Sequence, residues 1–141
     1  MNYKMIVLDL DGTLTNRDKI ITPRTKQSLM EAQKRGLKVV LASGRPTYGV
    51  MPLAEELELE TYEGYILSFN GGIIMNCRTK EILLKKELPV EANRRILELA
   101  RKEQVDVLTY EGAHILTNNP DNPYAKIESG INHLKLKKVE D

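Results

Sequence analysis

The sequence predicts an α/β protein built on a parallel sheet. Three short and mostly apolar runs, each bounded by charged or turn-forming residues, span residues 5–8, 39–42 and 65–69. Runs of this kind are typical of strands that are buried on both faces of a sheet. Helix-forming segments separate them, and strands that alternate with helices form parallel sheets with right-handed crossovers. We therefore expect a β-α-β-α-β arrangement in the first half of the chain.

Both intervening helices have recognisable end signals. Thr22 is a suitable N-cap for the first helix, Pro23 suits its first position, and Gly36 suits its end. The second helix is expected to begin at Pro46, and Pro52 inside it predicts a kink or a late restart. Its core-facing residues follow the helical i, i+3, i+4, i+7 spacing: Val50, Leu53, Ala54 and Leu57.

The pattern changes after residue 72, and an α+β piece is expected to follow a boundary near residue 83. The expected elements are two short strands, a strongly amphipathic helix and a hairpin, at residues 73–77, 82–86, 89–104, 105–110 and 114–117. The rest of the chain has the pattern of a weak helix or strand. We therefore expect two domains, residues 1–83 and residues 84–141.

The composition excludes several classes of protein. Hydrophobic residues make up 41% and charged residues 29%, as in soluble globular proteins. Lys and Arg number 21 against 20 for Asp and Glu, so a net charge of +1 argues against nucleic acid as a partner. No apolar stretch is long enough to span a membrane, and we expect no membrane partner. A single cysteine, Cys77, excludes an internal disulfide and favours a reducing compartment, the cytoplasm.

Two carboxylates, Asp9 and Asp11, follow the first strand in the string Asp-Leu-Asp-Gly-Thr-Leu. Ligands of open α/β sheets bind at the carboxyl ends of the strands, so both side chains should lie in the active crevice. Mg²⁺, a hard cation that takes oxygen ligands, would offset their mutual repulsion. One carboxylate can then attack a phosphoryl group, while the other protonates the leaving oxygen and activates water. The alternative is an ordinary turn at Asp11-Gly12, but the complete string favours catalysis.

The loop after the first strand also suits an anion. Gly12 permits backbone conformations that other residues avoid, and the N–H groups of residues 10–13 are suited to an anion-binding nest. We therefore expect the backbone of Leu10, Gly12 and Thr13 to contact a phosphate.

Further phosphate-binding candidates follow the second and third strands. The Ser43 hydroxyl and the Gly44 N–H group stand at a helix N-terminus, which is a favourable place for phosphate. Arg45 suits a bidentate clamp on an anionic substrate group, and Asn70 can reach the same crevice. The alternatives are a helix cap at Ser43, a solvated Arg45, and a turn set by Asn70 and the two glycines after it.

With these motifs the sequence resembles the haloacid dehalogenase (HAD) superfamily and, within it, the Cof-type hydrolases. The resemblance rests on residues 9–14, 41–46 and 68–72 and covers essentially the whole chain. It implies a Rossmann-like parallel-sheet core and the start of an α+β cap, both incomplete. It also implies hydrolysis of small phosphate esters, often sugar phosphates, with Asp9 as the nucleophile and Asp11 as the general acid and base. Mg²⁺ would be bound by the Asp9 carboxylate and the Asp11 backbone carbonyl, and the transferring phosphoryl group by Ser43 and Gly44.

The sequence departs from this family in its second half. Family members carry a phosphate-binding Lys and a Gly-Asp-x-x-Asn-Asp-like loop after the cap, and neither occurs in these 141 residues. Transition-state charge would then be only partly balanced, so we expect this chain to be weakly active or inactive by itself. In the family, later strands flank the first strand. Here that strand would be an uncovered edge, and a second copy of the chain is the expected partner.

Two other functions remain open at this point. The first is a non-catalytic fragment that binds phosphate or metal, which the missing later motifs favour. The second is a phosphomutase, which shares the aspartyl-phosphate chemistry. Incubation with a panel of phosphate esters and Mg²⁺ separates turnover from simple binding.

Overall fold

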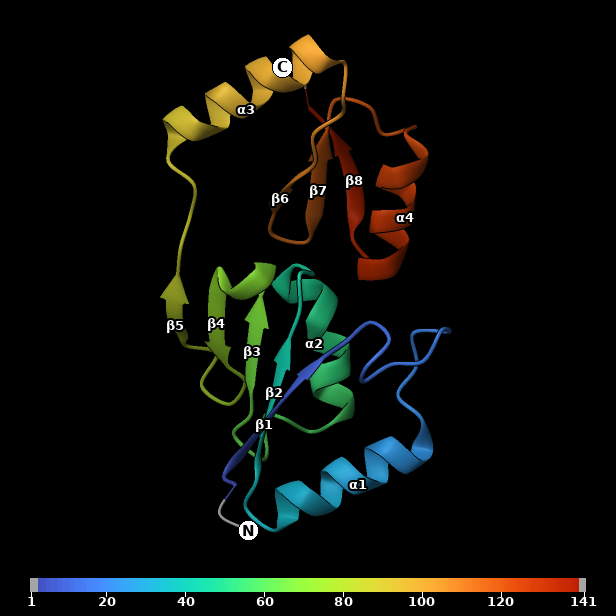
Figure 1. The fold of residues 1–141 in the computed structure, drawn as a ribbon, viewed down its shortest axis with the longest axis vertical. Helices are drawn as coiled ribbons and strands as arrows, with labels where there is room; N and C mark the ends of the chain where they lie inside the picture. The colour runs from blue at the N-terminus through green and yellow to red at the C-terminus, as the bar shows by residue number, and fades with distance from the viewer. Residues whose placement is uncertain (1–2, 140–141) are drawn as a thin grey trace. The chain divides into compact units, whose positions relative to one another are not determined.

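The computed structural model describes residues 3–139, which fall into two compact units (Figure 1). The first unit ends at Lys86 and the second begins at Glu87. The α/β class expected from the sequence is confirmed. None of the helices in the described part of the chain has both the length and the apolar character needed to cross a membrane.

The first unit is built on a five-stranded sheet of order β1-β2-β3-β4-β5. Its strands are β1 (Met5–Asp9), β2 (Lys38–Ala42), β3 (Tyr65–Ser68), β4 (Ile73–Asn76) and β5 (Ile82–Lys85). The first three are parallel, as expected, but β4 and β5 extend the same sheet in antiparallel pairs. The sheet is therefore mixed. Only the short 3₁₀ turn η1 (Phe69–Gly71) separates β3 from β4, and a connection this short allows only antiparallel neighbours.

Helix α1 (Pro23–Lys34) begins and ends where the sequence signals place it. The Thr22 side chain accepts a hydrogen bond from the Thr25 N–H group (3.2 Å) and so caps the first turn. Beyond the other end, Gly36 has a φ of +89°, a conformation that costs glycine little.

Helix α2 (Thr47–Glu56) continues through Pro52 as one helix, so the expected late restart at this proline does not occur. Proline removes one backbone hydrogen bond from the helix. Burial of the apolar face next to it, at Val50, Leu53 and Ala54, offsets that loss.

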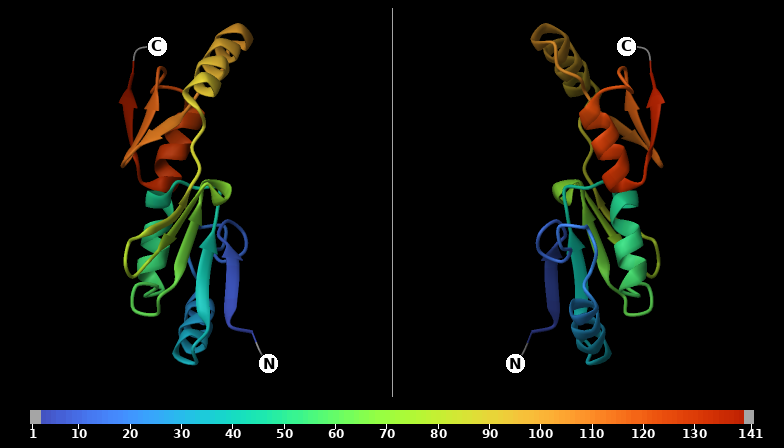
Figure 2. Two further views of the ribbon diagram at one scale, coloured as in Figure 1. Left: turned by 90° about the vertical axis from the view of Figure 1, so that its left-hand side faces the viewer. Right: turned by 90° about the vertical axis from the view of Figure 1, so that its right-hand side faces the viewer.

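One apolar core lies between the sheet and these two helices. Both parallel connections step to the next strand in the same direction, so right-handed crossovers place α1 and α2 on one face, as Figure 2 shows. The largest fully buried side chains of this unit are Leu10, Leu41, Leu57, Leu59 and Ile66. Ile6 and Leu8 of β1 pack against this cluster.

The prediction that β1 is buried on both faces is wrong. Its residues alternate between exposed and half-buried, and Met5 and Val7 are 50% and 54% exposed. The reason is position: β1 is an edge strand, and both helices of this unit cover the other face of the sheet. An apolar run records the tendency of a strand to be buried, but it does not supply the element that covers it.

The second unit contains a helix, α3 (Val90–Glu103), and a three-stranded sheet of order β6-β7-β8. Strand β6 (Thr109–Glu111) is shorter than the expected 105–110 and pairs antiparallel with β7 (His114–Thr117). The remainder, expected to be a weak helix or strand, forms both. Helix α4 (Pro123–Asn132) is capped by the Asn122 side chain, and β8 (Lys135–Lys138) pairs parallel to β7.

We expect the first unit to depend on Ile66, whose side chain is 1% exposed at the centre of the core. Ile66→Ala should lower the free energy of unfolding by about 2–5 kcal/mol, because it removes buried methyl groups and leaves a cavity. Urea unfolding followed by circular dichroism measures this. Ile20→Ala is the control, because Ile20 is 55% exposed in a loop of the same unit. Equal effects of the two substitutions would contradict the placement of the core.

Candidate active site

Three strand ends meet at one edge of the first unit. Asp9, the last residue of β1, is in register with Ala42, and Ala42 is in register with Leu67 of β3. The segments that follow β2 and β3 are joined by main-chain hydrogen bonds. The Ser43 N–H group donates to the Leu67 carbonyl (2.9 Å), and the Asn70 N–H group donates to the Ser43 carbonyl (3.0 Å). The motifs that follow the three strands are therefore neighbours in space.

Asp9 presents its carboxylate to solvent at this edge. The residue is exposed, and within residues 3–139 its carboxylate has no hydrogen bond or ion pair. Its backbone is fixed, because the Asp9 carbonyl accepts a hydrogen bond from the Leu14 N–H group (3.1 Å). An exposed carboxylate on a fixed backbone is accessible to an electrophile or a cation.

The neighbouring carboxylate, Asp11, is held by two cations. Arg45 forms two hydrogen bonds with the Asp11 carboxylate: Nε donates to Oδ2 at 2.9 Å and Nη2 donates to Oδ1 at 2.5 Å. Lys19 Nζ donates to the same Oδ1 at 2.8 Å. The Arg45 side chain is only 9% exposed, whereas that of Asp11 is 37% exposed. The sequence analysis assigns the Arg45 guanidinium to an anionic substrate group. In this structure the guanidinium binds the Asp11 carboxylate instead.

These contacts change the acidity of Asp11. The hydrogen bond from Arg45, and to a smaller extent that from Lys19, lowers the pKa of the Asp11 carboxyl from 3.8 to about 2, against the opposing effect of burial. At neutral pH only a fraction on the order of 10⁻⁵ of the molecules would carry a proton there. Asp11 is thus a carboxylate, and it cannot donate a proton until the cations move away.

The loop of residues 10–15 is closed by its own hydrogen bonds. Gly12 adopts a φ of +87°, the left-handed conformation for which the sequence has a glycine at this position. The Gly12 N–H group donates to the Thr15 carbonyl (3.2 Å) and the Thr13 N–H group donates to the Leu10 carbonyl (3.3 Å). Both bonds are long. An anion nest at Leu10, Gly12 and Thr13 remains a prediction, and it requires these two N–H groups to exchange partners.

Ser43, Gly44 and Asn70 pack closely at the next two strand ends. The Ser43 hydroxyl accepts a hydrogen bond from the Arg45 N–H group (3.2 Å). A Cβ atom on Gly44 would lie 3.2 Å from Asn70 Oδ1, so only glycine fits there without displacing the amide. Phe69 and Asn70 both have positive φ angles, 52° and 54°. Left-handed conformations in non-glycine residues cost energy and cluster at functional sites.

The donor atoms at this edge are oxygens, the type of ligand that Mg²⁺ prefers. The Asp9 carboxylate is accessible, and Mg²⁺ is bound by one or two protein oxygens together with water and substrate phosphate. The described residues contain no group of three or more acidic, His or Cys side chains that could hold a metal ion. The Asp9 carboxylate can therefore supply one oxygen ligand to such an ion, and the backbone carbonyl of Asp11 remains a predicted second ligand.

Three residues at this edge were not identified from the sequence. Lys19 pairs with Asp11, eight positions earlier in the chain, and nothing in the local pattern indicates that contact. Thr47 and Ser68 share a hydrogen bond of 2.6 Å between their hydroxyls, which ties the start of α2 to the end of β3. Ser68 is fully buried, so this bond helps to fix the loop that carries Asn70.

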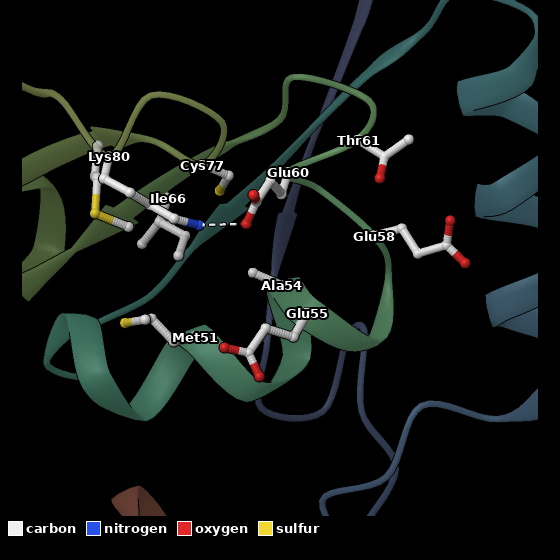
Figure 3. Close-up of a pocket in the computed structure, with 10 residues that line it drawn as sticks. Met51, Ala54, Glu55, Glu58, Glu60, Thr61, Ile66, Cys77 and Lys80 are labelled. Carbon is white, nitrogen blue, oxygen red and sulfur yellow. Dashed lines mark hydrogen bonds and ion pairs between the residues drawn. The ribbon is translucent and has the colours of Figure 1, made fainter.

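A pocket of about 310 Å³ lies at the opposite end of the sheet, near the C-terminus of α2 (Figure 3). Its lining includes Ala54, Ile66 and Cys77, with Glu60 and Lys80 paired at its rim (2.8 Å). Burial raises the pKa of the Cys77 thiol to about 11, so the thiol is not ionised at neutral pH and is a poor nucleophile. This pocket therefore adds no reactive group to the Asp9 site.

We expect Arg45→Gln to raise the pKa of Asp11 toward 3.8, because the largest cause of the lowered value is removed. Lys19→Gln should raise it less. Carbon-detected NMR titration of the Asp11 carboxyl measures both shifts. Arg17→Gln, at an exposed position of the same loop, is the control and should leave the titration unchanged. An unchanged pKa in Arg45→Gln would contradict the observed pairing.

The same ion pairs predict a dependence of stability on pH. A carboxyl with a lowered pKa in the folded state stabilises the fold above its unfolded value, and this contribution disappears as the pH falls through the folded value. For Asp11 the loss should occur between pH 3.8 and about 2. Acid unfolding of the wild type and of Arg45→Gln measures it, and the two proteins should converge at the acid end of this range. High salt should weaken the effect because Asp11 is partly exposed.

Comparison with known proteins identifies the family of this chain. The sequence pattern of the haloacid dehalogenase-like hydrolases matches residues 6–141. A protein of Streptococcus pyogenes serotype M6 is 35% identical over 121 residues, which are 84% of this chain and 45% of that protein. The pyridoxal phosphate phosphatase YbhA of Escherichia coli K12 is 25% identical over a segment that covers 85% of this chain and 43% of the YbhA chain.

A solved haloacid dehalogenase-like hydrolase from Bacteroides thetaiotaomicron is 46% identical, with a TM-score of 0.93 over 99% of this chain and 53% of that one. The chain thus spans about half the length of the relatives it matches. The family pattern covers the Asp9 strand, the Ser43 segment and the second unit alike, and the chain therefore belongs to the haloacid dehalogenase-like hydrolases.

Proposed function

We propose that this chain binds a small phosphate ester at the ends of β1, β2 and β3 and hydrolyses it through an aspartyl-phosphate on Asp9. The observation that carries the proposal is the accessible carboxylate of Asp9, which has no partner among residues 3–139, beside the Asp11–Arg45 ion pair. Membership in the hydrolase family supports the reaction class. The name of the E. coli relative, a pyridoxal phosphate phosphatase, supports a small phosphate monoester as the substrate class. Sugar phosphates are the members of that class that the family resemblance implies.

The first chemical step joins Asp9 to phosphorus. A carboxylate oxygen of Asp9 attacks the phosphoryl group, the bond from phosphorus to the ester oxygen breaks, and the departing alcohol takes a proton from Asp11. In the second step water attacks the phosphoryl group while Asp11 takes its proton. Inorganic phosphate leaves and Asp9 is restored. Ser43 and Gly44 would hold the phosphoryl oxygens, because they directly follow Ala42, the register partner of Asp9, in the segment that leads into α2.

Arg45 links substrate binding to the acidity of Asp11 in this proposal. Its guanidinium binds Asp11 in the structure, and an anionic substrate group would compete with Asp11 for the same N–H donors. Release of Asp11 raises its pKa toward the ordinary value and increases the fraction that carries a proton. The general acid would thus become available when a phosphate ester occupies the site.

The proposal includes Mg²⁺, for which this site offers only some of the ligands. When bound, it would screen the negative charge of phosphate and carboxylate, and Asp9 and the Asp11 carbonyl would hold it. The few acidic donors around Asp9 favour weak binding of the ion. Weak activity of the chain by itself follows from this and from the unbalanced charge on the phosphoryl oxygens. The reducing cytoplasm is the proposed compartment, which the free thiol of Cys77 favours.

Phosphate release from a panel of phosphate esters with Mg²⁺ tests the function. We expect slow release that is abolished in Asp9→Asn, because an amide cannot form the acyl phosphate, and a phosphoryl group on Asp9 after an acid quench. Asp18→Asn is the matched control, because Asp18 is another exposed aspartate of the adjoining loop. Phosphate binding without turnover would favour the non-catalytic fragment. Transfer of phosphate within the substrate, without release, would favour a phosphomutase.

A further inference from the structure

The pocket near the C-terminus of α2 is separate from the Asp9 site and has the size of a small-molecule site. Every residue that lines it lies between Met51 and Lys80, so the first unit forms this pocket by itself. Its volume of about 310 Å³ leaves room for about ten non-hydrogen atoms at roughly 30 Å³ each. A small organic molecule fits this space.

The floor of the pocket is apolar. Ala54 of α2 and Ile66 of β3 are 5% and 1% exposed, and both line it. Met75, the register partner of Ile66 on β4, and Cys77 are 9% and 3% exposed. The Cys77 thiol is neutral because burial raises its pKa, so these four side chains carry no charge. The apolar part of a ligand would leave water on this floor, which favours binding.

The rim of the pocket is acidic. Four of the six residues at positions 55–60 are glutamate. Glu56 and Glu60 each pair with a lysine, at 3.6 Å and 2.8 Å. Glu55 and Glu58 both line the pocket, and within residues 3–139 their carboxylates have no hydrogen bond or ion pair. The two glutamates that the protein leaves without a partner are thus both at the pocket.

The end of α2 adds to this negative charge. The C-terminal end of a helix carries a partial negative charge that favours cations and disfavours anions. Residues 53–56, the last turn of α2, contain no basic residue. Acidic side chains therefore gather where a helix disfavours them, and local conflicts of this kind occur at functional sites. A bound cation would neutralise both the carboxylates and the helix end.

We propose that this pocket binds a small organic cation, a primary amine with an apolar body. The ammonium group would pair with the Glu55 carboxylate, and the apolar body would lie on Ile66 and Met75. A primary amine is protonated at neutral pH, as lysine is. A neutral ligand would leave Glu55 without a partner, and an anion would be repelled.

The side chains in Figure 3 support a ligand with a single positive charge. The Glu55 carboxylate points toward Met51, whereas the Glu58 carboxylate points away from both Met51 and Lys80. On the side of the pocket where Glu55 lies, the pair of Glu60 with Lys80 is neutral as a whole. One uncompensated negative charge, that of Glu55, therefore faces this part of the pocket.

Titration of the chain with hexylamine, followed by NMR of side-chain methyl groups, tests the proposal. We expect saturable shifts of the Ile66 and Met51 methyl signals, with a dissociation constant on the order of millimolar for so small a ligand. The methyl signals of Ile20, in an exposed loop, should not move. Hexanol, of the same length but uncharged, should bind about fivefold more weakly, and hexanoate more weakly still. No saturable shift, or equal affinity for the amine and the alcohol, would overturn the proposal.

A pair of variants tests the role of Glu55. Glu55→Gln should weaken hexylamine binding about fivefold, because it removes the partner of the ammonium group. Glu58→Gln is the matched control: it removes the same charge from the same helix end, at a carboxylate that points away, and should change the affinity less than about twofold. Both residues are exposed, so both variants should fold, which circular dichroism checks. Unchanged binding in Glu55→Gln, or equal effects of the two substitutions, would contradict the assignment of the ammonium group to Glu55.

Discussion

The burial of β2 between β1 and β3 is the constraint on which the rest of the first unit depends. Val39, Val40 and Leu41 are 0%, 2% and 0% exposed, so this strand cannot slide without exposing apolar side chains. Its register with both neighbours fixes Asp9 beside Ala42, and Ala42 beside Leu67. The reactive edge is therefore positioned by apolar packing that takes no part in the chemistry. A shift of one residue would turn Asp9 to the other face of the sheet.

Within that frame, charge sets the state of the site. Arg45 and Lys19 hold Asp11 as a carboxylate, while Asp9 remains exposed with no partner within residues 3–139. Two aspartates that are two residues apart thus have different environments and different chemistry. The paired left-handed residues Phe69 and Asn70 complete the edge. Their strain is tolerated because main-chain bonds to Ser43 and Arg45 hold the loop in place.

Each unit also presents apolar surface that its own elements do not cover. In the first unit this surface is the exposed row of β1. In the second it is one side of α3, where Ile96, Leu97 and Leu99 are 41%, 41% and 57% exposed although the helix is strongly amphipathic. Contiguous exposed apolar patches of this kind mark interaction surfaces. Association with other polypeptide is thus a property to measure alongside catalysis.

The sequence by itself determined the α/β class, the capped ends of α1 and the residues that gather at the reactive edge. These features depend on local rules: apolar periodicity, the side chain of Thr22, and the position of Asp9, Ser43 and Asn70 after strands. Tertiary structure alone decided the pairing of Lys19 and Arg45 with Asp11, the antiparallel addition of β4, and the solvent exposure of one face of β1. Each of these depends on which segments become neighbours in space, and no pattern within a single segment encodes its neighbours.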